Sequence, residues 1–143
     1  MTDCDKLAQL VMERCDELGN VSQDDDCLDR RYLTKEHKQA NELVGGWMQD
    51  AGMQTWQDEA GNLWGRWQAA DPDAPRFIMG SHLDTVPNGG KYDGMLGVIT
   101  PVTLIAAMKA AGIRLPFHLD VVGFGDEEGT RFSSTLLGSR ALT

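Results

Sequence analysis

The second half of the chain alternates apolar runs with polar loops in a fixed order. The apolar run "RFIMGS" at 76–81 leads through the glycine-rich loop "HLDTVPNGGKYDG" into a long apolar segment at 94–111. A second apolar run at 115–125 leads into another polar loop, "DEEGTRF". Short apolar runs bounded by turn residues predict strands, and the longer segment, apolar on all sides, predicts a buried helix. A strand, a helix and a second strand in this order form a right-handed crossover. We therefore expect an α/β fold with a mainly parallel sheet flanked by helices.

The first half of the chain predicts two amphipathic helices and a hairpin. Thr34 is placed to cap the second helix, which we expect to end near Gly52. Two short extended pieces on either side of "DEAG" predict a β-hairpin. The segment 133–143 predicts the start of another helix. The residues predicted to face the core are Leu7, Leu10, Val11, Cys15 and Leu18 in the first helix and Ala40, Leu43, Val44, Trp47 and Met48 in the second.

Charge and composition exclude several classes of partner. The chain has 22 acidic and 13 basic residues and a net charge of -9, so binding to a phosphate backbone is not expected. Its amino terminus has neither the basic start nor the apolar core of a signal peptide, and no apolar run is long enough to span a bilayer. We expect a cytoplasmic protein that contacts neither nucleic acid nor membrane. Its three cysteines lack paired spacing and are interpreted as free thiols.

The first polar loop carries residue types that bind zinc. His82 ends the predicted strand, and Asp93 directly precedes the predicted buried helix. Imidazole nitrogens and carboxylate oxygens are zinc ligands, and the two oxygens of one carboxylate can bridge a pair of metal ions. Asp84, two positions after His82, is placed to accept the other imidazole N–H and so fix its tautomer.

The second loop carries Glu127 and Glu128 side by side. Adjacent side chains on an extended segment point to opposite sides, so one glutamate can bind a metal while the other takes a proton from a metal-bound water. Chemistry alone does not decide which glutamate does which. Because functional groups gather at the carboxyl ends of parallel strands, we expect the two loops to be neighbours in space.

Simpler interpretations exist for each loop taken alone. Either loop can be an ordinary turn, and the glycines at 89 and 90 can be considered as a phosphate cradle, although the spacing of a phosphate-binding loop is missing. The other two histidines are not expected to bind a metal. His37 is expected at the surface or in a helix cap, and His118 on a strand face. Pro101 is expected to kink the apolar helix if it lies beyond the first turns.

Together the loops resemble a known family. The runs "GSHLDTVPNGGKYDGMLGV" and "GFGDEEGTRFSSTLLGSRAL" are similar to the co-catalytic zinc amidohydrolase and peptidase superfamily. Their details resemble the subgroup of allantoate amidohydrolases and N-carbamoyl-L-amino-acid hydrolases, and the upstream part from about residue 28 is similar as well.

The resemblance implies a role for each polar residue. His82 would bind one metal ion, Asp93 would bridge two, and Glu128 would bind the second. Glu127 would be the general base, and Asp84 would steady His82. The implied cofactors are two divalent metal ions per protomer, with zinc expected and manganese as the alternative. Arg131 and Phe132 mark the subgroup without an evident role.

The resemblance also implies a reaction and a larger protein. We expect metal-dependent hydrolysis of a linear ureido or carbamoyl C–N bond in a small molecule. Allantoate is the first candidate substrate, followed by N-carbamoyl-L-amino acids and then by the substrate of β-ureidopropionase. The family has two more histidine ligands and a dimerisation domain downstream, so we expect 1–143 to be the N-terminal portion of an incomplete catalytic domain. Alone it is expected to be inactive, and the full-length protein is expected to be a homodimer.

Two other classes of function remain open on the sequence. One is a truncated, non-catalytic relative that serves as an interaction or metal-binding module. The other is a phosphate or nucleotide binder that uses the glycine loop, which would be stabilised by nucleotide without metal.

Overall fold

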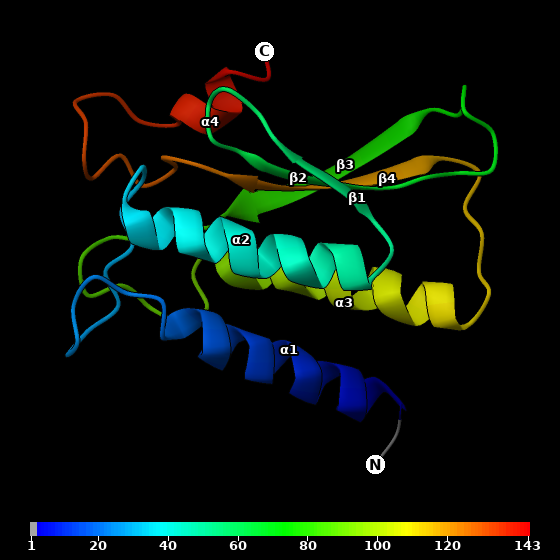
Figure 1. The fold of residues 1–143 in the computed structure, drawn as a ribbon, viewed down its shortest axis with the longest axis horizontal. Coiled ribbons are helices and arrows are strands. Elements are labelled where there is room, and N and C mark those ends of the chain that lie inside the picture. Colours follow the sequence, from blue (N-terminus) through cyan, green and yellow to red (C-terminus); the bar gives the residue numbers. More distant parts are fainter. Residues whose placement is uncertain (1–2) are drawn as a thin grey trace.

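The protein is a mixed sheet with helices packed mainly on one face, as a computed structural model describes for residues 3–143 (Figure 1). Helices α2 and α3 lie against the sheet, and α1 packs against α3 farther from it. The elements in chain order are α1 (Asp3–Gly19), α2 (Lys35–Asp50), β1 (Gln54–Gln57), β2 (Leu63–Trp67), β3 (Arg76–His82), α3 (Met95–Ala110), β4 (His118–Phe124) and α4 (Leu137–Arg140).

The sheet has the strand order β1-β2-β4-β3. The predicted crossover is confirmed, because β3 and β4 pair in parallel with α3 between them in the chain. The predicted hairpin is confirmed as well, with β1 antiparallel to β2. Strand β2 is also antiparallel to β4. The α/β class is therefore confirmed, but these four strands form a mixed sheet and not a mainly parallel one. The short hairpin connection can join only antiparallel strands, which accounts for the pairing of β1 with β2.

The core lies between the sheet and the helices. Val11, Cys15 and Leu18 of α1 are buried as predicted, whereas Leu10 is 36% exposed. In α2 the predicted stripe is buried at its centre and half-buried at Leu43 and Trp47. The helical periodicity therefore identified the correct face of both helices.

Helix α2 begins and ends where the sequence predicts. The hydroxyl of Thr34 accepts the backbone N–H of His37 at 3.1 Å, which caps the first turn. Gly52 has a φ of 84°, the left-handed conformation expected after the helix end. The His37 side chain is only 2% exposed, so the predicted surface position is wrong. The residue lies on the face of α2 that packs inward, where the ring of Tyr32 meets it edge-on at 5.5 Å.

Helix α3 buries mainly apolar side chains and continues through Pro101. Strand β3, on which α3 packs, is an edge of the described sheet, and Phe77 and Ile78 on it are 54% and 42% exposed. Within residues 3–143, no helix combines the length and the apolar character needed to cross a membrane.

Candidate metal centre

His82 is placed by the end of β3 and by a glycine beside it. The residue is 7% exposed and is the last of the strand. Gly94, directly before α3, has a φ of 70°, and a Cβ atom there would lie 2.5 Å from ring atoms of His82. A side chain at position 94 would therefore be strained by the backbone and would displace the imidazole. The bend before α3 thus forms one wall of the site.

The tautomer of His82 follows from its hydrogen bond. Its Nδ1 lies 2.9 Å from the backbone oxygen of Asp84, and since a carbonyl can only accept, Nδ1 carries the proton. The Asp84 carboxylate is 3.7 Å from Nδ1, which is longer than a hydrogen bond. The sequence placed the right residue beside His82, but the contact runs through its main chain and not through its carboxylate. The consequence is that Nε2 of His82 has a free lone pair.

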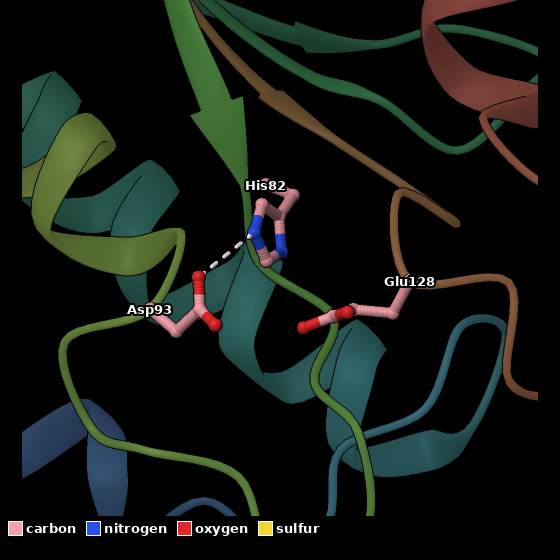
Figure 2. A group of neighbouring side chains, drawn as sticks. All are labelled: His82, Asp93 and Glu128. Atoms are coloured by element: carbon pink, nitrogen blue, oxygen red, sulfur yellow. Dashed lines mark ion pairs between the residues drawn. The ribbon is translucent and has the colours of Figure 1, made fainter.

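Nε2 of His82 faces carboxylates from both loops. It is 3.5 Å from Asp93 Oδ1 and 3.7 Å from Glu127 Oε2. One ligand atom from each of His82, Asp93 and Glu128 lies within 4.8 Å of the other two. Figure 2 shows these three side chains converging from the end of β3, the turn before α3 and the loop after β4. The two polar loops are therefore neighbours, as their positions after successive parallel strands predicted.

This set of side chains fits a divalent metal ion such as zinc. Zinc ligand atoms lie about 2.0–2.2 Å from the ion, so neighbouring ligand atoms of a tetrahedral site are roughly 3.3 Å apart. The separation of 3.5 Å between His82 and Asp93 is close to that value. A neutral imidazole and two carboxylates form a donor set that zinc accepts.

The Asp84 carboxylate holds the second loop by its backbone. The side chain is 1% exposed, and its two oxygens accept the N–H groups of Glu127 at 3.3 Å and of Glu128 at 3.2 Å. The loop is curled and not extended, because Asp126 and Gly129 have φ values of 58° and 61°. Both glutamates therefore approach His82, and the expectation that they point to opposite sides is wrong.

Burial makes negative charge unfavourable in this centre. Burial raises the pKa of the Asp84 carboxyl, and the N–H groups of Glu128 and Glu127 offset part of this effect. Burial also raises the pKa of Glu128, to which the charges of Asp93, Glu127 and Asp84 add. A bound cation would relieve both effects.

Asn62, which the sequence analysis did not single out, connects the hairpin to the second loop. Its side-chain oxygen accepts the N–H of Gly125 at 3.0 Å, and its Nδ2 donates to Asp58 at 2.9 Å and to the carbonyl of Gly138 at 3.0 Å. The residue is fully buried. Hydropathy patterns cannot reveal such a residue, because its role depends on partners far away in sequence.

Arg131 and Phe132 attach the second loop to the segment before α2. Nη1 of Arg131 donates to the backbone oxygen of Tyr32 at 2.8 Å. The ring of Phe132 meets the ring of Tyr32 edge-on at 6.1 Å. These contacts give the two residues a structural role in holding the acidic loop.

The other two histidines lie away from the centre. His37 is buried on α2, and no hydrogen-bond partner reaches its Nε2 within the described residues. His118 begins β4, at the opposite end of that strand from the metal centre, and accepts the N–H of Ala69 at its Nδ1. Of the residues from 3 to 143, only His82, Asp93 and Glu128 form a group of three or more potential ligands.

Comparison with known proteins agrees with the sequence resemblance. The model of Peptidase family M20/M25/M40 matches residues 78–143, which include both loops. This part of the chain is similar to the M20/M25/M40 peptidases. Allantoate deiminase 1 of Glycine max is 40% identical over 138 residues, which cover 95% of this chain and 29% of that protein. The N-carbamoyl-L-amino acid amidohydrolase of Geobacillus stearothermophilus is 42% identical over 133 residues, which cover 92% of this chain and 32% of that protein.

Solved structures show the same fold. A hydantoinase/carbamoylase family amidase from Burkholderia ambifaria superposes with a TM-score of 0.87 at 32% identity, over 92% of this chain and 33% of that one. The predicted family resemblance and fold class are confirmed. The chain spans about a third of the length of these relatives.

Proposed function

We propose that this chain is part of a metal-dependent amidohydrolase that cleaves a linear ureido or carbamoyl C–N bond. The observation that carries the proposal is the convergence of His82, Asp93 and Glu128 within 4.8 Å, with Glu127 beside them. Relatives named for allantoate and for N-carbamoyl-L-amino acids support the class of substrate.

The proposed roles follow from the geometry around His82. His82, Asp93 and Glu128 would hold two divalent ions, zinc in the first instance, with Asp93 shared between them. A metal ion bound here would supply a water of lowered pKa for attack on the ureido carbon. Glu127, whose side chain is 45% exposed, would take the proton of that water and return it to the leaving nitrogen. Asp84 would keep both glutamates in place through their backbone N–H groups.

The complete protein is proposed to be larger than this chain. One imidazole and a few carboxylates are too few ligands for two zinc ions, so further ligands must come from elsewhere in the protein. We propose that 1–143 is the N-terminal portion of the catalytic domain and is inactive alone. A cytoplasmic homodimer remains our expectation for the full-length protein.

Allantoate is the first substrate to test. The assay measures ammonia release by the full-length protein from allantoate and from N-carbamoyl-L-amino acids. Release from allantoate with the higher kcat/KM supports the first choice, and release only from the carbamoyl amino acids moves the assignment to the second. Cleavage of dipeptides alone would contradict the proposal.

Substitution of Glu127 tests the mechanism separately from the substrate. In the full-length enzyme we expect Glu127→Gln to lower kcat by about 10²–10⁴-fold, because the general base is lost. Metal analysis should still find about two ions per protomer, since the proposed ligands are untouched. Full activity of this variant would show that the base is another group.

A further inference from the structure

Arg30 is the largest side chain that is fully buried in the described structure. Its guanidinium has no carboxylate at hydrogen-bonding distance, and three backbone carbonyls bind it instead. Nη1 donates to the carbonyls of Leu18 and Val21, each at 2.8 Å, and Nε donates to the carbonyl of Leu83 at 2.9 Å. Burying a charge in this way is costly, so such a residue calls for a specific explanation.

The bonds of Arg30 connect the end of α1 to the loop that follows β3. Leu18 lies in the last turn of α1, and Val21 follows that helix. Leu83 lies between His82 and Asp84. The guanidinium is planar and rigid, so it sets the distance between these two segments in a way that a flexible side chain cannot.

The main chain of Arg30 also binds the loop that follows β3. Its N–H donates to the hydroxyl of Thr85 at 2.9 Å, and its carbonyl accepts the N–H of Thr85 at 3.0 Å. Residues on both sides of Asp84 are therefore bound to Arg30. The segment 83–85 is held from one side by a single residue.

Two further contacts attach the same polar loop to α1 and to the segment that follows it. The carbonyl of Leu28 accepts the N–H of Gly89 at 2.9 Å. Lys91 forms an ion pair with Asp16 of α1 at 2.6 Å. Both contacts lie nearer the surface than Arg30, so Arg30 is the buried member of this set.

We propose that Arg30 is a positioning residue for the metal centre, acting through the backbone of 83–85. The carbonyl of Asp84 orients His82, and the carboxylate of Asp84 holds Glu127 and Glu128. Arg30 fixes the residues on either side of Asp84 and thereby fixes both of these contacts. This inference rests on the metal centre of the proposed function.

Burial and charge agree with this role. The negative charge of Asp84 favours the protonated guanidinium, whereas burial lowers the pKa of Arg30 to about 10. Arg30 therefore remains a cation at neutral pH. A lysine at this position would keep the charge but could not donate to three carbonyls in a fixed plane.

The test compares Arg30→Lys with Val44→Ala in the full-length protein. Val44 is fully buried on α2 and is not part of the attachment, so its truncation serves as a control for general loss of stability. Zinc affinity is measured by competition with a chromophoric chelator, alongside Tm. We expect Arg30→Lys to weaken zinc binding about 10–100-fold, as is typical when a residue supporting a metal ligand is changed. Val44→Ala should lower Tm without such a change.

A second measurement uses metal-free protein, so its result does not depend on the proposed activity. Hydrogen exchange at the backbone N–H groups of Thr85, Glu127 and Glu128 should accelerate in Arg30→Lys and not in Val44→Ala. If Arg30→Lys fails to fold, Thr85→Val removes one bond of the same attachment and should give a smaller effect in the same direction. Unchanged zinc affinity and unchanged exchange, or equal effects in both variants, would overturn the proposal. A wild type that binds no zinc would instead refute the metal centre itself, while the exchange experiment would still test Arg30.

Discussion

At the scale of single residues, the proposed metal centre depends on positions where one atom decides the geometry. Gly94 is such a position, because a Cβ atom there would lie 2.5 Å from the His82 ring. Gly112 offers a matched control, since it has the same φ of 70° but open space around its Cβ position. Comparing alanine at Gly94 with alanine at Gly112 separates the effect of backbone strain from the effect of displacing the His82 imidazole.

We expect Gly94→Ala to destabilise the protein and to weaken metal binding. A positive φ is unfavourable for alanine, so both Gly94→Ala and Gly112→Ala should lose about 1–2 kcal/mol or more, with the larger loss at Gly94, whose ψ is -59°. Only Gly94→Ala should also reduce zinc affinity, because only there is the proposed metal ligand His82 displaced. Chemical denaturation and metal titration of the full-length protein measure the two effects. Equal zinc affinity in both variants would contradict the placement of His82.

The buried His37 should make the stability of the folded protein depend on pH. Burial, aided by the charge of Arg30, lowers its pKa from 6.5 to about 4 in the folded protein. As the pH falls below 6.5, the unfolded chain binds a proton that the folded protein does not accept until about pH 4. The folded state therefore loses stability through this window, by about 1.4 kcal/mol per pH unit.

The corresponding measurement is the free energy of unfolding at pH 7 and pH 5 in wild type and in His37→Phe. The loss of stability between these two pH values should be smaller in the variant by about 2 kcal/mol, because phenylalanine keeps a ring at this position but cannot titrate. The same pH dependence in both proteins would show that His37 titrates normally in the folded state.

At the scale of elements, the pairing of β2 with β4 is reinforced by one ion pair. Nε and Nη2 of Arg66 donate to the two oxygens of Asp120, both at 2.7 Å, and these residues face each other in the strand register. The Asp120 side chain is 1% exposed and that of Arg66 is 24% exposed. Two parallel charge-assisted bonds of this kind are stronger than ordinary surface pairs.

Asp120→Asn should therefore destabilise the sheet by about 2 kcal/mol, since one partner of a largely buried pair loses its charge. The matched control is Lys6→Ala, which breaks the exposed pair of Lys6 and Asp3 and should cost less than about 0.5 kcal/mol. Urea denaturation of both variants measures the difference. Similar costs for the two substitutions would contradict a special role for the Arg66 pair.

At the scale of the whole molecule, β3 is one of the two edge strands of the described sheet. Its outer side has no strand partner within residues 3–143, and Phe77 and Ile78 leave apolar surface beside it. Edges of this kind favour association with other strands.

We expect the 143-residue chain to self-associate as its concentration rises, and Ile78→Lys to reduce this association. A charge on an edge strand opposes pairing between edges. The control is Leu104→Lys, a comparably exposed position on α3 and away from the edge. Light scattering over a concentration series measures the effect. If both substitutions reduce association equally, the association depends on exposed apolar surface in general and not on the edge of β3.

The local elements of this fold could be predicted because each leaves a periodic signal in the sequence. The two amphipathic helices, the hairpin and the crossover around α3 are confirmed. The mixed character of the sheet was not predicted, because apolar runs do not encode the direction of their neighbours. The burial of His37 was missed for a similar reason, since a single histidine has no periodicity.

The sequence by itself identified the residues of the candidate centre. His82, Asp93, Glu127 and Glu128 stand out because metal-binding side chains follow two successive strands, and those strands end at the same edge. The tertiary structure alone decided how these residues are held. The contact of the Asp84 carbonyl with His82, the curl of the acidic loop and the bonds of the buried Arg30 all depend on the main chain. Every residue has the same main-chain groups, so residue identity cannot indicate which of them will meet.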